Sequence, residues 1–210
     1  MSIRLAQLAD VKAALNFSGT DEDAVLARCI EQASAVAERL VGRSLGRVEQ
    51  AIEYPRAIDY GVARLWLKGS PIESVAMIKL LGWTGNADEF STIDPLGEDL
   101  YEVDGEAGLI ELLHGEAWSP MPRANLVVYT HGYANADATP GSDGLAATAI
   151  LPGDDLQQGV VVEAIRLYRT QGDAGLDQVK AGKAGAYRPD HDTPHPALAQ
   201  ACEALRRVGV

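Results

Sequence analysis

The stretch SAVAERLVGRSL, Ser34–Leu45, marks the point where the sequence pattern changes from helix to strand. Its first eight residues continue an amphipathic pattern that starts at Asp21, with apolar residues three and four positions apart. Gly42 follows the last periodic residue, which is the usual place of a helix-terminating glycine. We therefore predict one helix over Asp21–Val41. Its apolar stripe comprises Val25, Leu26, Cys29, Ile30, Ala33, Val36, Ala37 and Leu40.

The period changes after Arg47 and stays strand-like to about Tyr133. The run ARLWLKGSPIESVAMIKLLG is typical of two strands joined by a Gly-Ser-Pro turn. In LYEVDGEAGLIELL, the pair Asp104-Gly105 is a strong hairpin signal. ANLVVYTHGYA is apolar on both faces, which indicates a central strand. We predict a small, mostly antiparallel sheet of roughly five or six strands.

Helices flank this region on both sides. A shorter helix, about Leu8–Leu15, precedes the long one, and LPGDDLQQGVVVEAIRLYRTQG predicts another from Pro152 to Gly172. A last helix, PALAQACEALRR, follows a long aperiodic segment. The predicted fold class is α+β: a bundle of long amphipathic helices with a small β-sheet subdomain inserted. The boundaries are 1–46 and 150–172 for the helical core, 47–133 for the β subdomain, 134–149 for a loop, and 173–210 for a C-terminal extension ending in a helix.

The composition is that of a globular protein, with 47% apolar and 23% charged residues. No apolar run approaches the roughly 20 residues of a membrane span, and MSIRLAQLAD has no apolar core of a secretory signal. We therefore expect no membrane association. Cys29 and Cys202 lie on apolar stripes, which favours buried free thiols in a reducing compartment.

The net charge of −12 excludes ordinary binding to nucleic-acid phosphates, which needs clustered lysine and arginine. Ten acidic residues and no basic one lie between Lys79 and Arg123. Two interpretations remain open: a solubilising face, or a surface that must not hold a polyanion passing nearby.

Three short motifs come close to ligand sites and fail. AGKAG, Ala181–Gly185, lacks the residues that complete a phosphate-binding loop. YEVDGEAGLIE resembles a calcium loop, but Leu100 stands where the first carboxylate is required, so an ordinary hairpin is expected. In DHDTPH, His191 and His195 have a chelating spacing, but the neighbouring prolines oppose a helix across them. We predict no metal, no cofactor and no enzymatic activity.

The order of elements resembles the head-tail connector, or adaptor, proteins of tailed bacteriophages and related gene-transfer particles. The resemblance covers most of residues 5–172. It rests on the order and spacing of LAQLADVKAAL, DEDAVLARCIEQASAVAERLVGRSL, KGSPIESVAMIKLLG, YEVDGEAGLIELLHGEAWSPMP, LVVYTHGY and LPGDDLQQGVVVEAIRLYRTQG. The loop after Gly132-Tyr133 is longer than is usual for the family, and the extension after Gly172 matches only loosely.

The resemblance implies a structural subunit of a phage-like virion. Such subunits form a ring, usually twelvefold, in the neck beneath the portal, after assembly in the host cytoplasm. The ring extends the DNA channel without binding DNA specifically, and it offers a docking surface to the next neck, stopper or tail protein. The alternative is a small α+β ligand-binding domain or enzyme.

Two sets of residues are the candidate contacts. Mixed charges on the sides of the long helices favour pairing between neighbours in a ring; these residues are Arg28, Glu31, Arg39, Glu163, Arg166 and Arg169. A glycine-rich, positively charged arm that ends in an amphipathic helix favours docking to the portal; the residues of this set are Lys180, Lys183, Arg188, Leu198, Leu205, Arg206 and Arg207. The alternative is that the last helix packs on its own subunit, because most amphipathic helices belong to a core.

Overall fold

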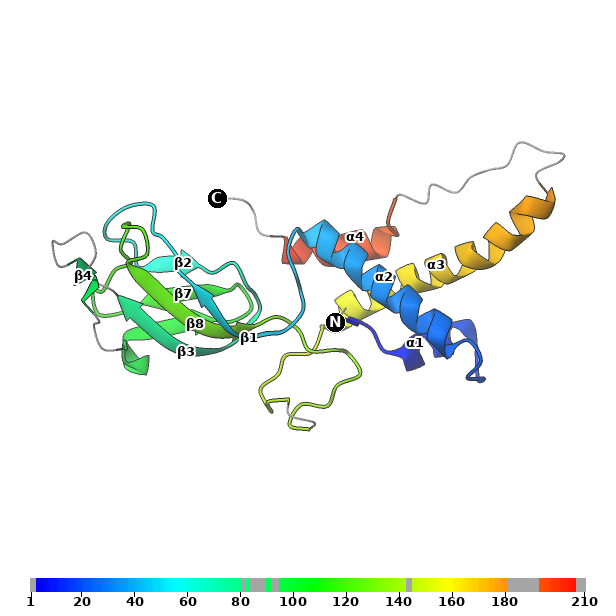
Figure 1. Cartoon of the computed structure of the whole chain (residues 1–210), viewed down its shortest axis with the longest axis horizontal. Coiled ribbons are helices and arrows are strands. Elements are labelled where there is room, and N and C mark those ends of the chain that lie inside the picture. Colours follow the sequence, from blue (N-terminus) through cyan, green and yellow to red (C-terminus); the bar gives the residue numbers. More distant parts are fainter. Residues whose placement is uncertain are drawn as a thin grey trace. The chain divides into compact units, whose positions relative to one another are not determined.

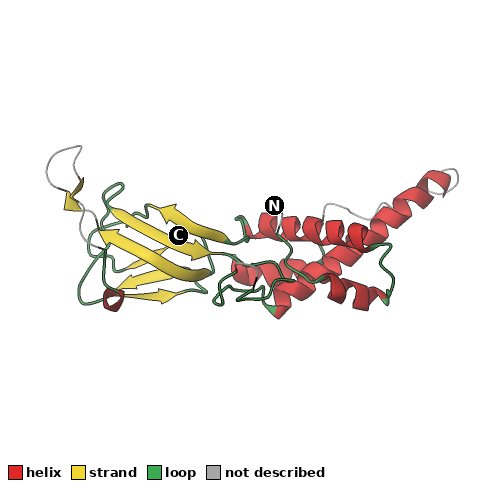
Figure 2. Cartoon of the chain, turned by 60° about the horizontal axis from the view of Figure 1, so that its bottom comes forward, coloured by secondary structure: helices red, strands yellow, loops and turns green. Residues whose placement is uncertain are grey.

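The chain divides into a helical unit and a β unit (Figures 1 and 2). The helical unit comprises Met1–Ser44, Ala134–Asp143 and Leu151–Val210, and the β unit comprises Leu45–Tyr133 and Gly144–Ile150. The computed structural model describes residues 3–80, 82–83, 90–91, 95–142, 145–180 and 193–206. The two predicted kinds of structure, helical bundle and antiparallel sheet, are both present, which confirms the α+β class.

The helical unit is built around α2, which spans Asp23–Val41. The helix ends at Gly42, whose φ of 80° is left-handed and whose N–H donates to Glu38 O, as the sequence predicts. α1 spans Leu8–Leu15 and contacts both α2 and α3. Both cysteines are free and buried in this unit, and burial raises the pKa of each thiol. The buried residues of α2 are Leu26, Cys29, Ile30, Ala33, Ser34 and Ala37.

Helix α3 is longer than predicted: it spans Asp154–Lys180 and continues through Gly172. A glycine inside a helix costs only about 1 kcal/mol relative to alanine, and it ends a helix only where the backbone turns left-handed. The preceding turns of α3 are packed against α1, α2 and α4, so the helix is already nucleated when it reaches the glycine. Among the described residues, no helix combines the length and apolarity that crossing a membrane requires.

The last helix, α4, spans Pro196–Leu205 and packs against α2 and α3 (Figure 1, red, beside blue and yellow). Leu198 and Cys202 are 0% and 1% exposed. The Cys202 thiol lies 3.9 Å from Ala37 O, and Gly159 in α3 leaves the space that the Leu198 backbone fills. α4 therefore belongs to the core of the helical unit, and the expectation that it is a free docking helix is wrong.

The β unit contains two three-stranded antiparallel sheets and a two-stranded ladder. The first sheet has the order β1-β8-β3 (Val48–Glu53, Asn125–His131, Ile72–Leu80), with the apolar strand β8 central as predicted. The second has the order β2-β7-β6 (Arg64–Trp66, Leu109–Leu112, Tyr101–Asp104), and the short 3₁₀ helix η1, Glu98–Leu100, leads into it. β4 (Gly82–Trp83) pairs with β5 (Phe90–Ser91). The described residues thus hold eight strands instead of five or six, because three of them are only two or three residues long.

Inward-facing residues of both three-stranded sheets form a single apolar core in the β unit. Trp118 and Tyr129 are its largest members. The other buried members of this core are Ala57, Leu67, Ile72, Ile78, Ile110, Leu112 and Val127.

The segment predicted as a loop, 134–149, has neither helix nor strand in its described residues, 134–142 and 145–149, and its two parts belong to different units. In the helical unit, Ala136 N donates to Arg4 O at 2.8 Å and Asn135 Oδ1 accepts from Arg4 N at 2.9 Å. In the β unit, the Thr148 hydroxyl donates to Glu73 at 3.1 Å. The segment therefore anchors the N-terminal stretch at one end and the sheet at the other.

Candidate interaction surface

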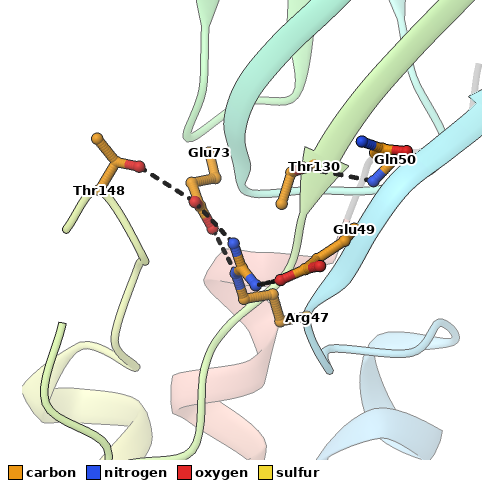
Figure 3. A network of polar contacts seen from close by, with 6 residues as sticks. All are labelled: Arg47, Glu49, Gln50, Glu73, Thr130 and Thr148. Carbon is orange, nitrogen blue, oxygen red and sulfur yellow. Dashed lines mark hydrogen bonds and ion pairs between the residues drawn. The ribbon is translucent and has the colours of Figure 1, made fainter. Parts of the chain in front are cut away.

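A buried ion pair fixes the end of the β unit at which the chain enters it (Figure 3). The Arg47 guanidinium donates twice to Glu73, with Nε–Oε2 and Nη2–Oε1 distances of 2.6 and 2.9 Å, and it also contacts Glu49. The Glu73 side chain is almost fully buried. The hydrogen bonds from Arg47, helped by Thr148, hold the pKa of Glu73 below its ordinary value despite burial. This bidentate pair ties the start of β1 to β3 and to the incoming segment at Thr148.

The same end is closed by a tight backbone crossing. Gly132 has a φ of 88°, and a Cβ built on it would lie 2.3 Å from the carbonyl oxygen of Gly46. Tyr133 N donates to Leu45 O and Arg47 N donates to Tyr133 O, at 2.8 and 2.9 Å. Only glycine fits at position 132, because both the dihedral angle and the neighbouring backbone exclude a side chain.

At the other end of the strands, the loop 54–63 lies beside the loop 113–124. Asn125, fully buried, holds the two together: its Nδ2 donates to Pro55 O at 2.9 Å and to Ser119 O at 2.8 Å. The Arg56 guanidinium donates to Pro120 O at 2.6 Å. Trp118 N donates to Val62 O at 2.8 Å, so the first loop is anchored at both of its ends.

Between these anchors, apolar side chains point into solvent. Ile58 is 87% exposed and Tyr60 is 75% exposed, the highest values among the large apolar residues of the described chain. The sequence pattern did not predict this loop as a surface, although Pro55 and Gly61 bracket Ile58 and Tyr60 in a stretch without periodicity. Of the exposed large apolar side chains that the structure describes, only Phe17 lies in the helical unit. The others are Val48, Ile52, Tyr54, Ile58, Tyr60, Trp66, Val103 and Met121.

The outer face of the sheet β2-β7-β6 carries a hollow of about 360 Å³. Cross-strand pairing places Arg64, Glu111 and Glu102 in one row across it, and Arg64 Nε lies 2.9 Å from Glu111 Oε2. Asp104 and Leu109 belong to the next row and also line the hollow, with Val103. The hollow is thus an open, mainly acidic depression.

The motifs that come close to metal sites form ordinary structure within the described residues. The calcium-like run is the β6–β7 hairpin, in which Asp104 Oδ1 accepts from Ala107 N at 2.9 Å. His195 caps α4: its Nδ1 accepts from Ala197 N at 3.2 Å. His191 and the AGKAG motif lie outside the described residues. Within the ranges that are described, no group of three or more histidine, cysteine or acidic side chains is placed to hold a metal ion.

The predicted ring-interface set divides into two groups. Arg28, Arg39 and Arg169 are exposed and Glu31 is half-buried, so all four can reach a neighbour. Glu163 is fully buried and accepts from Arg166 Nη2 at 2.6 Å, from Arg166 Nε at 3.0 Å and from His195 N at 2.9 Å. The assignment of Glu163 to the ring interface is therefore wrong. Its carboxylate faces inward, with Arg166 as its partner, and joins α3 to the start of α4.

Only some residues of the predicted portal-docking set lie in the part of the chain that the structure describes. Lys183, Arg188 and Arg207 lie outside the described residues, and Lys180 is the last residue of α3. Leu198 is buried, so it cannot bind a partner while α4 is packed; this assignment is wrong. Leu205 is half-buried, and the exposed Arg206 donates from Nε to Leu40 O at 2.8 Å.

We expect Glu163→Ala to lower the free energy of unfolding of the helical unit by about 2–4 kcal/mol, because the change leaves the Arg166 guanidinium and the His195 N–H without their acceptor. Chemical denaturation followed by circular dichroism at 222 nm measures the difference. Glu203→Ala, at an exposed position of α4, is the control and should stay within about 0.5 kcal/mol of the unchanged protein.

The stability that the Glu163 carboxylate contributes should depend on pH. Burial alone would raise the pKa of Glu163, but the hydrogen bonds from Arg166 and from the His195 N–H outweigh it and hold the pKa below the ordinary value of 4.5. A group with a depressed folded-state pKa adds stability above its unfolded pKa, and that stability is lost as the pH falls through the folded value. The stability difference between the unchanged protein and Glu163→Gln should therefore shrink below about pH 4.5. A difference that is constant across this range would contradict the assignment.

Comparison with known proteins finds a family match in the N-terminal part of the chain. Residues 5–68, which contain α1, α2, β1 and β2, match a family described as phage gp6-like head-tail connector protein. The resemblance to the head-tail connector family is confirmed over this part of the chain. The match extends from the helical unit into the β unit.

Two solved structures resemble the chain, and the first of them shares its fold. One is described as the neck of an empty GTA particle computed with C6 symmetry: it has 20% sequence identity and a TM-score of 0.50, covering 98% of this chain and 91% of that chain. Another, the neck of a native GTA particle computed with C12 symmetry, has 18% identity and a TM-score of 0.46, with the same coverage of 98% and 91%. Among curated proteins, none matches the chain significantly.

Proposed function

We propose that the protein is a head-tail connector subunit of a phage-like particle, located in the neck between capsid and tail. The observation that carries this proposal is the connector-family match over residues 5–68, because it spans elements of both units. The role is mechanical: the subunit extends the DNA channel beneath the portal and offers a docking surface to the next neck or tail protein. Catalysis is not part of it, because the matched family and the neck particle are structural.

The charge distribution supports a channel that DNA passes without being held. The whole chain carries a net charge of −12, and the β unit alone has 14 acidic and six basic residues. Phosphate binding depends on clustered lysine and arginine that displace counterions from DNA. An acidic wall offers phosphates no such partners, so a wall of this kind would let DNA slide past.

A closed ring is the quaternary structure that the role requires. The exposed Arg28, Arg39 and Arg169 and the half-buried Glu31 offer charges of both signs for a heterologous contact between neighbours. Such pairs contribute only about 0–1 kcal/mol each, so we expect the ring to form on the portal and the free protein to remain monomeric. The C6 symmetry of the neck that shares this fold is in keeping with a ring of six or twelve copies.

The contact with the portal is proposed for the end of α3 and the positively charged residues that follow it. Lys180, Lys183 and Arg188 give a positive sign to this stretch of an otherwise acidic chain. Leu205, Arg206 and Arg207, at the end of α4, remain in the proposed set, whereas the buried Leu198 leaves it.

Electron microscopy of assembled particles tests the proposed function. We expect density for this chain in the neck, repeated around the channel in a ring of multiple copies. Heads should form without the protein, but tails should not attach to them. Particles that lack the protein, or hold it as a single copy, would contradict the proposal. Size-exclusion chromatography of the purified protein should give the mass of a monomer.

A further inference from the structure

The β unit has two distinct ends, and the strand register identifies them. Ile72 and Val48 both pair with His131 at one end, close to the points at which the chain passes to and from the helical unit, at residues 44–45 and 133–134. At the opposite end, Leu80 pairs with Asn125. The loops 54–63 and 113–124 adjoin the strands at that opposite end, and we call them the distal loop pair.

The distal loop pair presents apolar side chains on a rigid support. Ile58, Tyr60, Tyr54 and Met121 are all exposed. The hydrogen bonds of Asn125, Arg56 and Trp118 described above hold the loops against each other, and Tyr60 N donates to Asp59 Oδ1 at 2.7 Å within the tip. An anchored loop loses little conformational freedom on binding, so most of the free energy gained by burying its apolar side chains contributes to affinity. Tyrosine is enriched among the residues that dominate interface energies.

The distal loop pair could bind a second copy of this chain or a different protein, and charge distinguishes the two. The β unit that carries the loops has 14 acidic and six basic residues, so two such units brought together would repel. The hollow on the described part of the β unit is lined by Glu102, Asp104 and Glu111 with Arg64. A second copy that bound there would therefore meet mainly carboxylates like its own. The two loops themselves carry charges of both signs, Arg56 and Arg123 with Asp59 and Glu116, so the acidic excess lies in the rest of the unit. A surface with an apolar pocket and a rim of lysine and arginine complements those surroundings.

We propose that the distal loop pair is the docking surface for a different protein, one whose apolar pocket, rimmed by basic residues, receives Ile58 and Tyr60. This inference rests on the proposed function, in which the partner is the protein that follows the connector in the neck. The docking contact is then separate from the contacts that hold the connector on the head.

The test is particle assembly with the double variant Ile58→Ala/Tyr60→Ala. Heads made with this variant should contain the connector at the level of the unchanged protein, measured by immunoblotting of purified DNA-filled heads. The fraction of those heads that carry a tail, counted by electron microscopy, should fall about tenfold or more, as expected for the loss of dominant interface residues. The matched control is Val48→Ala/Ile52→Ala, which truncates two exposed apolar residues of β1 in the same unit and should leave the tailed fraction unchanged.

Folding is checked on the purified proteins. Both residues of the test variant are highly exposed, so its melting temperature should stay within about 2 °C of that of the unchanged protein. A normal tailed fraction for the test variant would overturn the inference and leave the proposed function intact. Loss of the variant from the heads would also overturn it, since the loops would then hold the connector on the head or on its neighbours. Absence of the unchanged protein from heads would overturn the proposed function, and the docking inference with it.

Discussion

A chain ended at Lys180 is expected to lose the cooperative folding of its helical unit. Such a chain lacks α4, whose Leu198 and Cys202 are buried against α2 and α3. Removing a single buried leucine side chain costs about 2–5 kcal/mol, and whole domains are stable by only about 5–15 kcal/mol. The loss of an entire packed helix, including its links to Glu163 and Leu40, therefore reaches the scale of the total stability.

The two units can be followed separately in this experiment. The three tryptophans, Trp66, Trp83 and Trp118, all belong to the β unit, so tryptophan fluorescence reports on that unit alone. The four α-helices of the described chain all belong to the helical unit, so circular dichroism at 222 nm reports mainly on the other. We expect the thermal transition at 222 nm to disappear or to become broad, with exposed apolar surface that promotes aggregation.

The control is a chain ended at Arg206, which keeps α4 whole and should melt like the full chain. Leu198→Asp, which leaves the length unchanged, should weaken the helical unit in the same direction. If the chain ended at Lys180 instead stays folded, with an unchanged transition at 222 nm, then α4 is dispensable to the core. In that case the original expectation of a docking arm would regain its support.

Gly132→Ala is expected to destabilise the β unit by more than about 3 kcal/mol. Two effects add at this position: the φ of 88° strains any residue with a Cβ, and that Cβ would lie 2.3 Å from the Gly46 carbonyl oxygen. The obstacle is backbone held by the hydrogen bonds of Leu45, Arg47 and Tyr133, so it cannot rotate away as a side chain would. In tryptophan fluorescence, the melting temperature should fall by more than about 10 °C.

Gly115→Ala separates the two effects. Gly115 has a similar φ of 86° in the same unit, but nothing lies within 4 Å of the position of its Cβ. Its substitution therefore adds strain without a clash, and it should cost only about 1 kcal/mol. Equal losses for the two variants would show that the crossing at Gly46 yields, and that the clash contributes little.

The local pattern of the sequence determined where most of the elements lie. Leu26, Ile30, Ala33 and Ala37 recur at helical spacing, and they are buried in α2 as predicted. Asp104 ends β6 and Gly105 begins the turn of the β6–β7 hairpin, and the doubly apolar strand Asn125–His131 is central in its sheet. These features were predictable because periodicity and turn residues act over a few neighbouring positions.

The tertiary structure decided which surfaces of those elements are free. From the sequence, Glu163 and Arg166 read as a charged helix side, yet the N-terminus of α4 covers Glu163 and turns the pair inward. Leu198 lies on the apolar stripe of α4 whether that helix packs on a partner or on its own unit. An amphipathic pattern indicates that one helix face is buried, but it does not indicate what covers that face. Ile58 and Tyr60 read as ordinary apolar residues. Asn125, which lies 65 or more positions further along the chain, anchors their loop. This anchoring leaves both side chains exposed to solvent as a candidate docking surface.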